Sequence, residues 1–220
     1  MFDETMLRPT PEQQRPMEAC DLRFRALLPT EQWDALPVAV RRRFAKRLKG
    51  GDTVVYTGTV VEAHSSRIGW ALAQICRLMG GPLPTAADTG VASVVTVTED
   101  RATGGQVWTR LYARRDGFPQ TIHSAKRFEG ETGLEEHVGC GIGMSLKVSV
   151  EDGALVFRQH RYFLALGARR LRLPAWLTPG ALIVKHIDLG GRRFAFTLDI
   201  AHPRFGPLIH QRVEFTDATR

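Results

Sequence analysis

The chain has 220 residues, a formal net charge of +7, 43% hydrophobic residues and 24% charged residues. This length suits one large domain, and the composition is that of a globular protein. No apolar run approaches the roughly 20 residues of a membrane-spanning helix. The three cysteines, Cys20, Cys76 and Cys140, are odd in number and far apart. They argue against a disulfide framework or a cysteine zinc site, and a cytoplasmic protein is expected.

The two ends of the domain are set by composition. Residues 1–20 are polar and rich in proline, without the apolar run of a secretory signal, so they are predicted to be a disordered lead. Residues 21–220 are predicted to form a single α+β domain. We find no internal repeat in this part of the sequence.

Two segments have the spacing of amphipathic helices. In 31–48, Leu36, Val40 and Phe44 recur at i, i+4 and i+8, and Pro37 suits a first helical turn. In 66–79 a second apolar stripe follows the 3.6-residue period, preceded by serines that can cap a helix and followed by glycines that can end one. That stripe consists of Ile68, Leu72, Ile75 and Met79.

The rest of the chain has the pattern of about nine strands, together with a short segment at 133–138. These segments are 53–63, 91–99, 105–114, 119–127, 133–138, 143–150, 154–166, 182–189, 193–201 and 206–215. Tight turns such as Asp152-Gly153 and Gly190-Gly191 favour hairpins and therefore antiparallel pairing. We expect a strongly curved antiparallel sheet or an open β-barrel with two packed helices, lipocalin-like or helix-grip-like. The 66–79 helix would be a plug or a lid.

Two strands place a charge among apolar residues. Trp108, Arg110 and Tyr112 alternate onto one face of their strand, and Arg161 alternates with Phe157 in another. A charge on an apolar face must be paired, reach water or line a cavity. A structural, paired arginine is one interpretation, and an internal polar site is the other.

Other residue pairs suggest chemistry without specifying it. Glu135 and His137 are two residues apart, so on a strand they share a face and could form an acid–base pair or half of a metal site. Ser124 would complete a hydrolase set, but no G-x-S-x-G turn surrounds it. No phosphate-binding glycine motif occurs between a strand and a helix. We expect no metal and no cofactor.

Several short motifs, in order, resemble a known family. They include YTGTV, the W-x-R element at Trp108 and Arg110, LEEHVG around Glu135, RLRLPAWLTP, and FTLDIAHPRFGPL. This order is similar to that of the bacterial domain of unknown function 4166 family, over nearly the whole chain after the first 20 residues. The resemblance implies a shared fold and no established catalytic residues. The chain departs from the family pattern where Cys140 follows Gly139.

These observations give three functional hypotheses. The first is a non-catalytic binding module for a small hydrophobic or amphipathic ligand, held between the curved sheet and the 66–79 helix. Its predicted ligand-binding residues are Trp108, Arg110, Ser124, Glu135, His137 and Arg161. The second is an enzyme that uses the same cavity, with Glu135 and His137 as acid and base.

The third hypothesis is a peripheral protein of the inner membrane. The helix at 31–48 carries a cluster of cations that would suit an anionic membrane surface, or simply a solvated face. These cations are Arg41, Arg42, Arg43, Lys46 and Arg47. The loop 173–179 would add apolar contacts. Aromatic residues are sparse in the basic cluster, so no specific nucleic-acid binding is expected.

Overall fold

The computed structural model describes residues 20–48, 51–167 and 169–217, so the predicted lead, apart from Cys20, lies outside the described residues. The strands are β1 (Thr53–Ser65), β2 (Ala92–Asp100), β3 (Gly105–Tyr112), β4 (Gln120–Arg127), β5 (Glu135–Gly139), β6 (Ile142–Glu151), β7 (Ala154–Leu166), β8 (Arg169–Arg172), β9 (Ala181–Gly190), β10 (Arg193–His202) and β11 (Gly206–Thr216). The helices are α1 (Arg23–Ala26), α2 (Thr30–Ala35), α3 (Val38–Phe44) and α4 (Arg67–Cys76), with single 3-10 turns at η2 (Arg77–Met79) and η3 (Ala175–Leu177).

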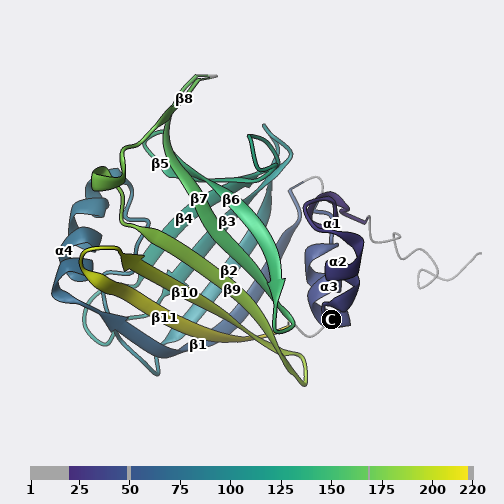
Figure 1. The fold of residues 1–220 in the computed structure, drawn as a ribbon. Helices are drawn as coiled ribbons and strands as arrows, with labels where there is room; N and C mark the ends of the chain where they lie inside the picture. The colour runs from purple at the N-terminus through teal and green to yellow at the C-terminus, as the bar shows by residue number, and fades with distance from the viewer. Residues whose placement is uncertain (1–19, 49–50, 168, 218–220) are drawn as a thin grey trace, which may run out of the picture.

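Ten of the strands form a closed antiparallel barrel, and β8 is an extra strand beside β7 (Figure 1). Nine neighbouring pairs run from β6 through β5, β4, β3, β2, β1, β11, β10 and β9 to β7, and a tenth pair joins β7 to β6. Strand β7 therefore closes the ring. Its residues 155–158 pair with β9 on one edge, while its other edge pairs with β6. The last residues of β7 pair with β8.

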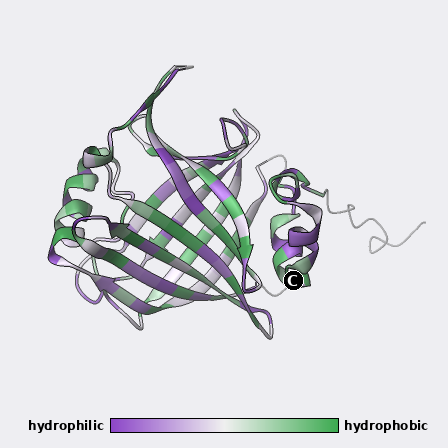
Figure 2. Ribbon diagram, viewed as in Figure 1, coloured by the Kyte–Doolittle hydropathy of each residue, from purple (hydrophilic) through white to green (hydrophobic). Residues whose placement is uncertain are grey.

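The predicted class, a strongly curved antiparallel sheet or barrel with packed helices, is confirmed, and the barrel is closed. Hydrophilic and hydrophobic residues alternate along the strands (Figure 2), as expected where one face is wet and the other encloses a core. Strand β8 was not predicted, because its sequence, RRLR, lacks the pattern of a strand. It forms because β7 extends beyond its pairing with β9 and offers a free edge to the returning chain.

The single helix predicted over 31–48 is two helices. Pro37 lies at the N-cap of α3, and Leu36 before it has an extended backbone with ψ of 144°. A residue that precedes proline is pushed out of the helical conformation by the proline ring, so the chain breaks there. The predicted stripe still forms, because Leu36, Val40 and Phe44 are all buried.

Helices α1–α3 pack at one end of the barrel (Figure 1). Phe24 and Phe44 contact one another edge to face, with ring centroids 5.1 Å apart, and both lie near Phe157 of β7. The guanidinium of Arg43 is mostly buried and donates hydrogen bonds to the carboxylates of Asp188 and Asp217, at 3.2 and 2.7 Å. This end of the barrel is therefore held by an apolar contact and a shielded ion-pair cluster.

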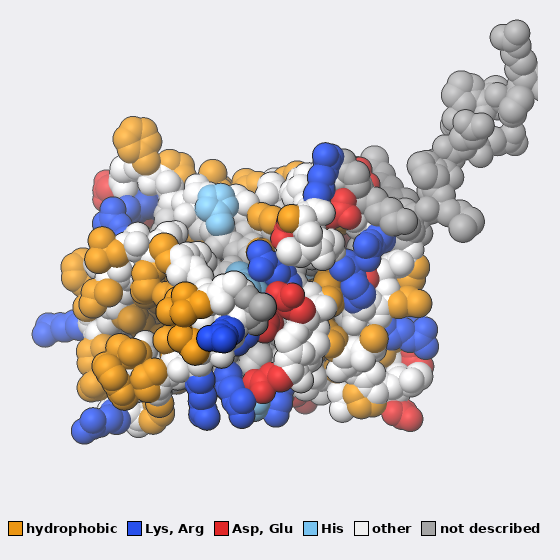
Figure 3. Space-filling view, turned by 90° about the horizontal axis from the view of Figure 1, so that it is seen from above, with side chains coloured by type: hydrophobic (Ala, Val, Ile, Leu, Met, Phe, Trp, Pro, Cys, Tyr) orange, Lys and Arg blue, Asp and Glu red, His pale blue; other side chains and the backbone are white. Residues whose placement is uncertain are grey.

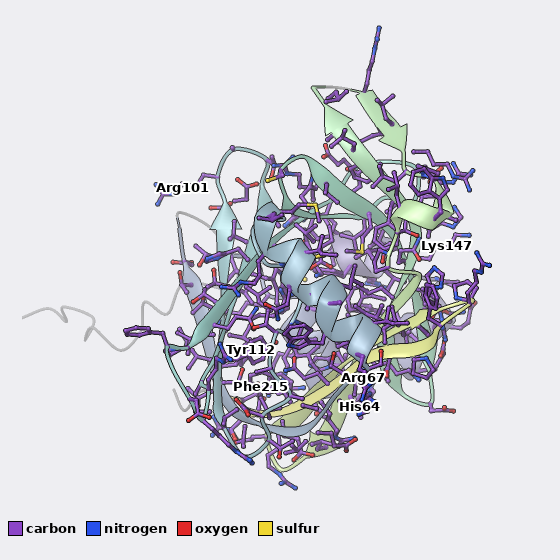
Figure 4. All side chains as sticks on the ribbon, turned by 90° about the vertical axis from the view of Figure 1, so that its left-hand side faces the viewer. His64, Arg67, Arg101, Tyr112, Lys147 and Phe215 are labelled. Carbon is purple, nitrogen blue, oxygen red and sulfur yellow. The ribbon has the colours of Figure 1, made fainter. Side chains whose placement is uncertain are left out.

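Helix α4 lies across the opposite end of the barrel (Figures 1 and 4). Ser66 caps it by accepting a hydrogen bond from the Gly69 backbone N–H at 3.1 Å, as the sequence predicted. The Ser66 backbone N–H donates to the carbonyl of Leu208 on β11 at 2.9 Å. A Cβ atom at Gly69 would collide with that same carbonyl. Gly69 therefore lets the helix approach the barrel rim.

Substituting Gly69→Ala should lower the free energy of unfolding by roughly 1–3 kcal/mol, because the new methyl group forces α4 away from β11. On a helix with free space at that position, the same change raises the free energy of unfolding by about 1 kcal/mol. A loss of stability therefore indicates the collision with β11, and a gain indicates that there is none. In a Cys20→Ser, Cys140→Ser background, the buried thiol of Cys76 on α4 should also react faster with a thiol reagent. Unchanged stability and unchanged reactivity would show that the helix is not held by this contact.

Candidate functional site

A cavity of about 460 Å³ lies inside the barrel beneath α4. Residues from most of the barrel strands, from α4 and from the segment 173–179 line it, and most of its lining is apolar. Figure 4 looks onto the end of the barrel that α4 crosses; Tyr112 of β3 and Phe215 of β11, both labelled there, belong to the lining. The volume is within the range of about 300–1,000 Å³ that is usual for small-molecule sites.

Strand alternation determines which polar groups reach the cavity. Trp108, Arg110 and Tyr112 of β3 all line it, on the face that the sequence had grouped. On the neighbouring strand β4, Ser124 and Lys126 point the same way. Three of the six predicted site residues, Trp108, Arg110 and Ser124, are therefore in the cavity wall.

The polar groups of this wall form one hydrogen-bonded charge cluster. The Ser124 hydroxyl donates to Oε1 of Glu136 at 2.7 Å, and one Arg110 nitrogen donates to Ser124 Oγ at 3.0 Å. A second Arg110 nitrogen reaches Glu136 Oε1 at 3.5 Å, and the Lys126 ammonium lies 3.0 Å from Oε2. Lys126 also lies 5.0 Å from the centre of the Trp108 ring, within the range of a cation–π contact.

The electrostatics of the cluster keep Glu136 ionised. Burial opposes ionisation, but the charges of Lys126 and Arg110 and the hydrogen bond from Ser124 outweigh it and lower the pKa of Glu136 to about 2. Burial lowers the pKa of Lys126, and the adjacent Glu136 carboxylate offsets part of that effect. With all three groups charged, two cations share one carboxylate, so the cluster has one positive charge in excess.

One further hydroxyl group faces the cavity without a partner among the described residues. The Tyr162 hydroxyl is buried and makes no hydrogen bond there. Burial, followed by the neighbouring Cys76 and Glu136, raises the pKa of Tyr162, so its hydroxyl stays protonated and can donate. A buried hydroxyl without a partner costs free energy, and a bound polar group could offset that cost.

Glu135 and His137 form a pair, but on the outer side of β5. The two side chains are 3.0 Å apart, between His137 Nε2 and Glu135 Oε2, and neither lines the cavity. Lys126 is directly opposite Glu136 in the β4–β5 register, so those two residues share the inward face. The acid and base of the enzyme hypothesis therefore lie outside the cavity in which it placed them.

Arg161 also lies outside the cavity, because a β-bulge changes the alternation of β7. Ser145 pairs with Arg161, but the next pair is Leu146 with Gln159, which leaves one extra residue in β7. Phe157 before the bulge and Tyr162 after it therefore both point inward. Arg161 is 45% exposed and pairs with Glu131 at 3.0 Å.

Lys126 and Glu136 are the cavity residues that sequence reasoning missed. The signal for Glu136 was present: Leu134 and Val138 lie two residues to either side, and alternation puts all three on one face. The apolar flanks thus marked Glu136, rather than Glu135, as the acid on the cavity face of β5. Lys126 alternates with Ile122 in the same way.

The outer pair belongs to a cluster with the atoms of a possible metal site. Single ligand atoms of Glu129, Glu135 and His137 lie within 4.8 Å of one another. However, the guanidinium of Arg170 already binds both carboxylates, at 3.1 Å for Glu135 and 3.0 Å for Glu129. Burial and the nearby Arg127 lower the pKa of His137 more than Glu135 raises it. The cluster is accounted for as an ion-pair network.

The basic segment of α3 lies at the other end of the molecule from α4 and the 173–179 loop (Figure 1). Arg43 is mostly buried against two carboxylates, Arg41 lies 3.6 Å from Asp34, and Arg47 lies 4.0 Å from Asp21. No helix among the described residues is long and apolar enough to cross a bilayer.

These features define a class: a closed antiparallel β-barrel with a helix across one end and an internal, mainly apolar cavity that contains a charge cluster. The chain belongs to the family described as Domain of unknown function (DUF4166), whose model matches residues 36–215. That range covers the barrel from β1 to the penultimate residue of β11, and the match confirms the family resemblance of the sequence motifs. No curated protein and no solved structure matches the chain significantly.

Substituting Glu136→Gln should lower the free energy of unfolding by roughly 3–5 kcal/mol, because it leaves the buried Lys126 and the partly buried Arg110 without a counter-charge. Adding Lys126→Met should restore a substantial part of that loss, since the uncompensated ammonium is then gone. Urea unfolding of the two variants and the parent protein measures both effects. If Glu136→Gln were neutral, or if the second change made it worse, the cluster would not be coupled as described.

Proposed function

We propose that the protein binds one small amphipathic molecule inside the barrel and does not transform it. The observation that carries this proposal is the cavity of about 460 Å³ inside the barrel, with a mainly apolar wall and one charge cluster. Sites for small molecules combine an apolar surface with a few polar groups that fix orientation. The only carboxylate of the cluster, Glu136, is ionised and held by three donors, so it is poorly suited to act as a proton-transferring group.

The charge cluster favours a ligand with an acidic head group. Arg110 and Lys126 together exceed the charge of Glu136 by one, and Arg110 keeps some accessible surface. A carboxylate or similar anion near Arg110 would receive charge-assisted hydrogen bonds, which are about twice as strong as neutral ones. The unpartnered Tyr162 hydroxyl is a further potential donor.

The distribution of lining residues favours one orientation of that ligand. The cluster lies on the wall made by β3, β4 and β5, whereas the end beneath α4 is lined by apolar side chains. These include Leu72, Ile75, Met79, Leu173 and Leu177. The head group would therefore lie inside the barrel and the apolar part would extend toward α4.

A cytoplasmic location fits the three thiols, which are all free.

The test compares a fatty acid with the fatty alcohol of the same chain length. The parent protein should bind the acid at least about tenfold more tightly, because the neutral alcohol cannot form an ion pair with Arg110. Arg110→Met should bring the two affinities together, mainly by weakening the acid. Displacement of a fluorescent hydrophobic probe measures both ligands in all variants.

Arg161→Met is the matched control, since Arg161 has the same charge but lies outside the cavity beside Glu131. Its affinities should equal those of the parent. If neither the acid nor the alcohol displaced the probe, the binding proposal would fail. If Arg110→Met reduced the affinities for the acid and the alcohol equally, the apolar cavity could still be a binding site, but the proposed recognition of an acidic head group would be wrong.

A further inference from the structure

Large apolar side chains are exposed around the end of the barrel that α4 crosses. We call this set the lid patch: Ile68, Trp70, Ile75, Leu78, Trp176 and Leu177. Leu78 is 86% exposed and Trp176 is 78% exposed. Figure 3, seen from above, shows orange side chains gathered at the left, which is the α4 end in Figure 1. Exposed apolar residues that cluster in this way indicate a contact surface.

The same end of the molecule carries an excess of positive charge. Arg67 is exposed on α4, Arg77 is exposed at the start of η2, and Arg172 is exposed where β8 leads into the 173–179 segment. Within residues 66–91 and 167–180 the sequence has a single acidic residue, Asp88. Basic side chains surrounding apolar ones are the combination by which proteins bind the surface of an anionic bilayer.

The lid patch is also where the cavity approaches the exterior. Ile75 of α4 and Leu177 of η3 both line the cavity and are both more than half exposed. Each side chain is therefore in contact with the cavity on one side and solvent on the other. A molecule entering between α4 and the 173–179 segment would pass directly from the lid patch into the barrel.

We propose that this end of the barrel docks on an anionic lipid bilayer. Trp70, Leu78 and Trp176 would enter the interface between head groups and acyl chains, and the exposed arginines beside them, Arg67, Arg77 and Arg172, would contact the lipid phosphates. Tryptophan suits this depth because its ring is apolar and its N–H is polar. Exchange of an amphipathic ligand through the opening beside Ile75 rests on the proposed function, whereas the docking itself does not.

The surface differs from the one that the charge pattern of the sequence suggested. The cluster at Arg41–Arg47 lies at the opposite end of the barrel, which α1–α3 cover (Figure 1). One flat membrane cannot contact both ends at once. Exposed residues at that end, Leu22 and Val38 among them, therefore serve as internal controls.

The experiment measures sedimentation with phosphatidylcholine vesicles in which about one third of the lipid is phosphatidylglycerol. The parent protein should bind these vesicles and bind pure phosphatidylcholine much less. The double variant Leu78→Ser, Trp176→Ser should bind at least about tenfold more weakly, since it removes the two most exposed apolar groups of the lid patch. The matched double variant Leu22→Ser, Val38→Ser should bind as the parent does.

A second pair of variants tests the charges. Arg67→Glu with Arg172→Glu should weaken vesicle binding and reduce its dependence on salt, whereas Arg25→Glu with Arg42→Glu at the α1–α3 end should change neither. Loss of binding in the Arg25 and Arg42 variant alone would overturn the proposal in favour of the basic helix. Equal binding by all the variants would overturn it as well.

Two further outcomes would contradict the docking proposal. The parent protein could fail to bind the anionic vesicles, or the lid patch could prove to join two copies of the chain, seen as a dimer that the Leu78 and Trp176 changes dissociate. Probe binding in vesicle-free solution is measured in parallel. If the lid-patch variant keeps probe binding but no longer binds vesicles, docking and ligand binding use separate parts of the protein. If the parent protein binds vesicles but does not bind the probe, the cavity function is wrong and the docking proposal stands.

Discussion

The closure of the barrel by β7 is the constraint on which the other features depend. One edge of this strand pairs with β6, and its other edge pairs with β9. With ten strands in the ring, the interior is wider than that of an eight-stranded barrel, whose side chains just fill it. Inward-facing side chains therefore line a cavity and do not fill the interior of the barrel. The helices follow from this, because each end of the barrel must be covered to bury its apolar lining.

Within that space, the arrangement of three charges supports the proposed preference for an acidic head group. Glu136 is stable as a buried carboxylate only because Lys126 and Arg110 lie beside it, and those two cations then exceed it in charge. The excess lies on one side of an otherwise apolar wall. The exposed apolar and basic groups lie at the α4 end, where Ile75 and Leu177 mark the opening. The proposed head-group recognition inside and the proposed membrane contact outside would thus serve one amphipathic ligand.

Sequence periodicity predicted the fold class, because hairpin turns and alternation are local signals that closure does not alter. It also grouped Trp108 and Arg110 on one face, which lines the cavity, whereas Ser124 was named for its chemistry and not from alternation. It failed for Arg161, because one extra residue in β7 reverses the alternation after the bulge, and a bulge has no clear signal in a single sequence. Glu135 was chosen for its proximity to His137, although the apolar neighbours of Glu136 marked the position that faces the cavity. The break at Pro37 was predictable from the conformational restriction on Leu36.

The most direct test of the account is native mass spectrometry of the protein purified under mild conditions, together with a variant whose cavity is filled by Val138→Trp. Val138 lines the cavity from β5, so the larger ring should occupy ligand space. The account predicts one bound amphipathic molecule per parent chain and none on the variant, with both proteins folded by circular dichroism. A parent chain that carries no such molecule, and takes up added fatty acid no better than the filled variant, would contradict it.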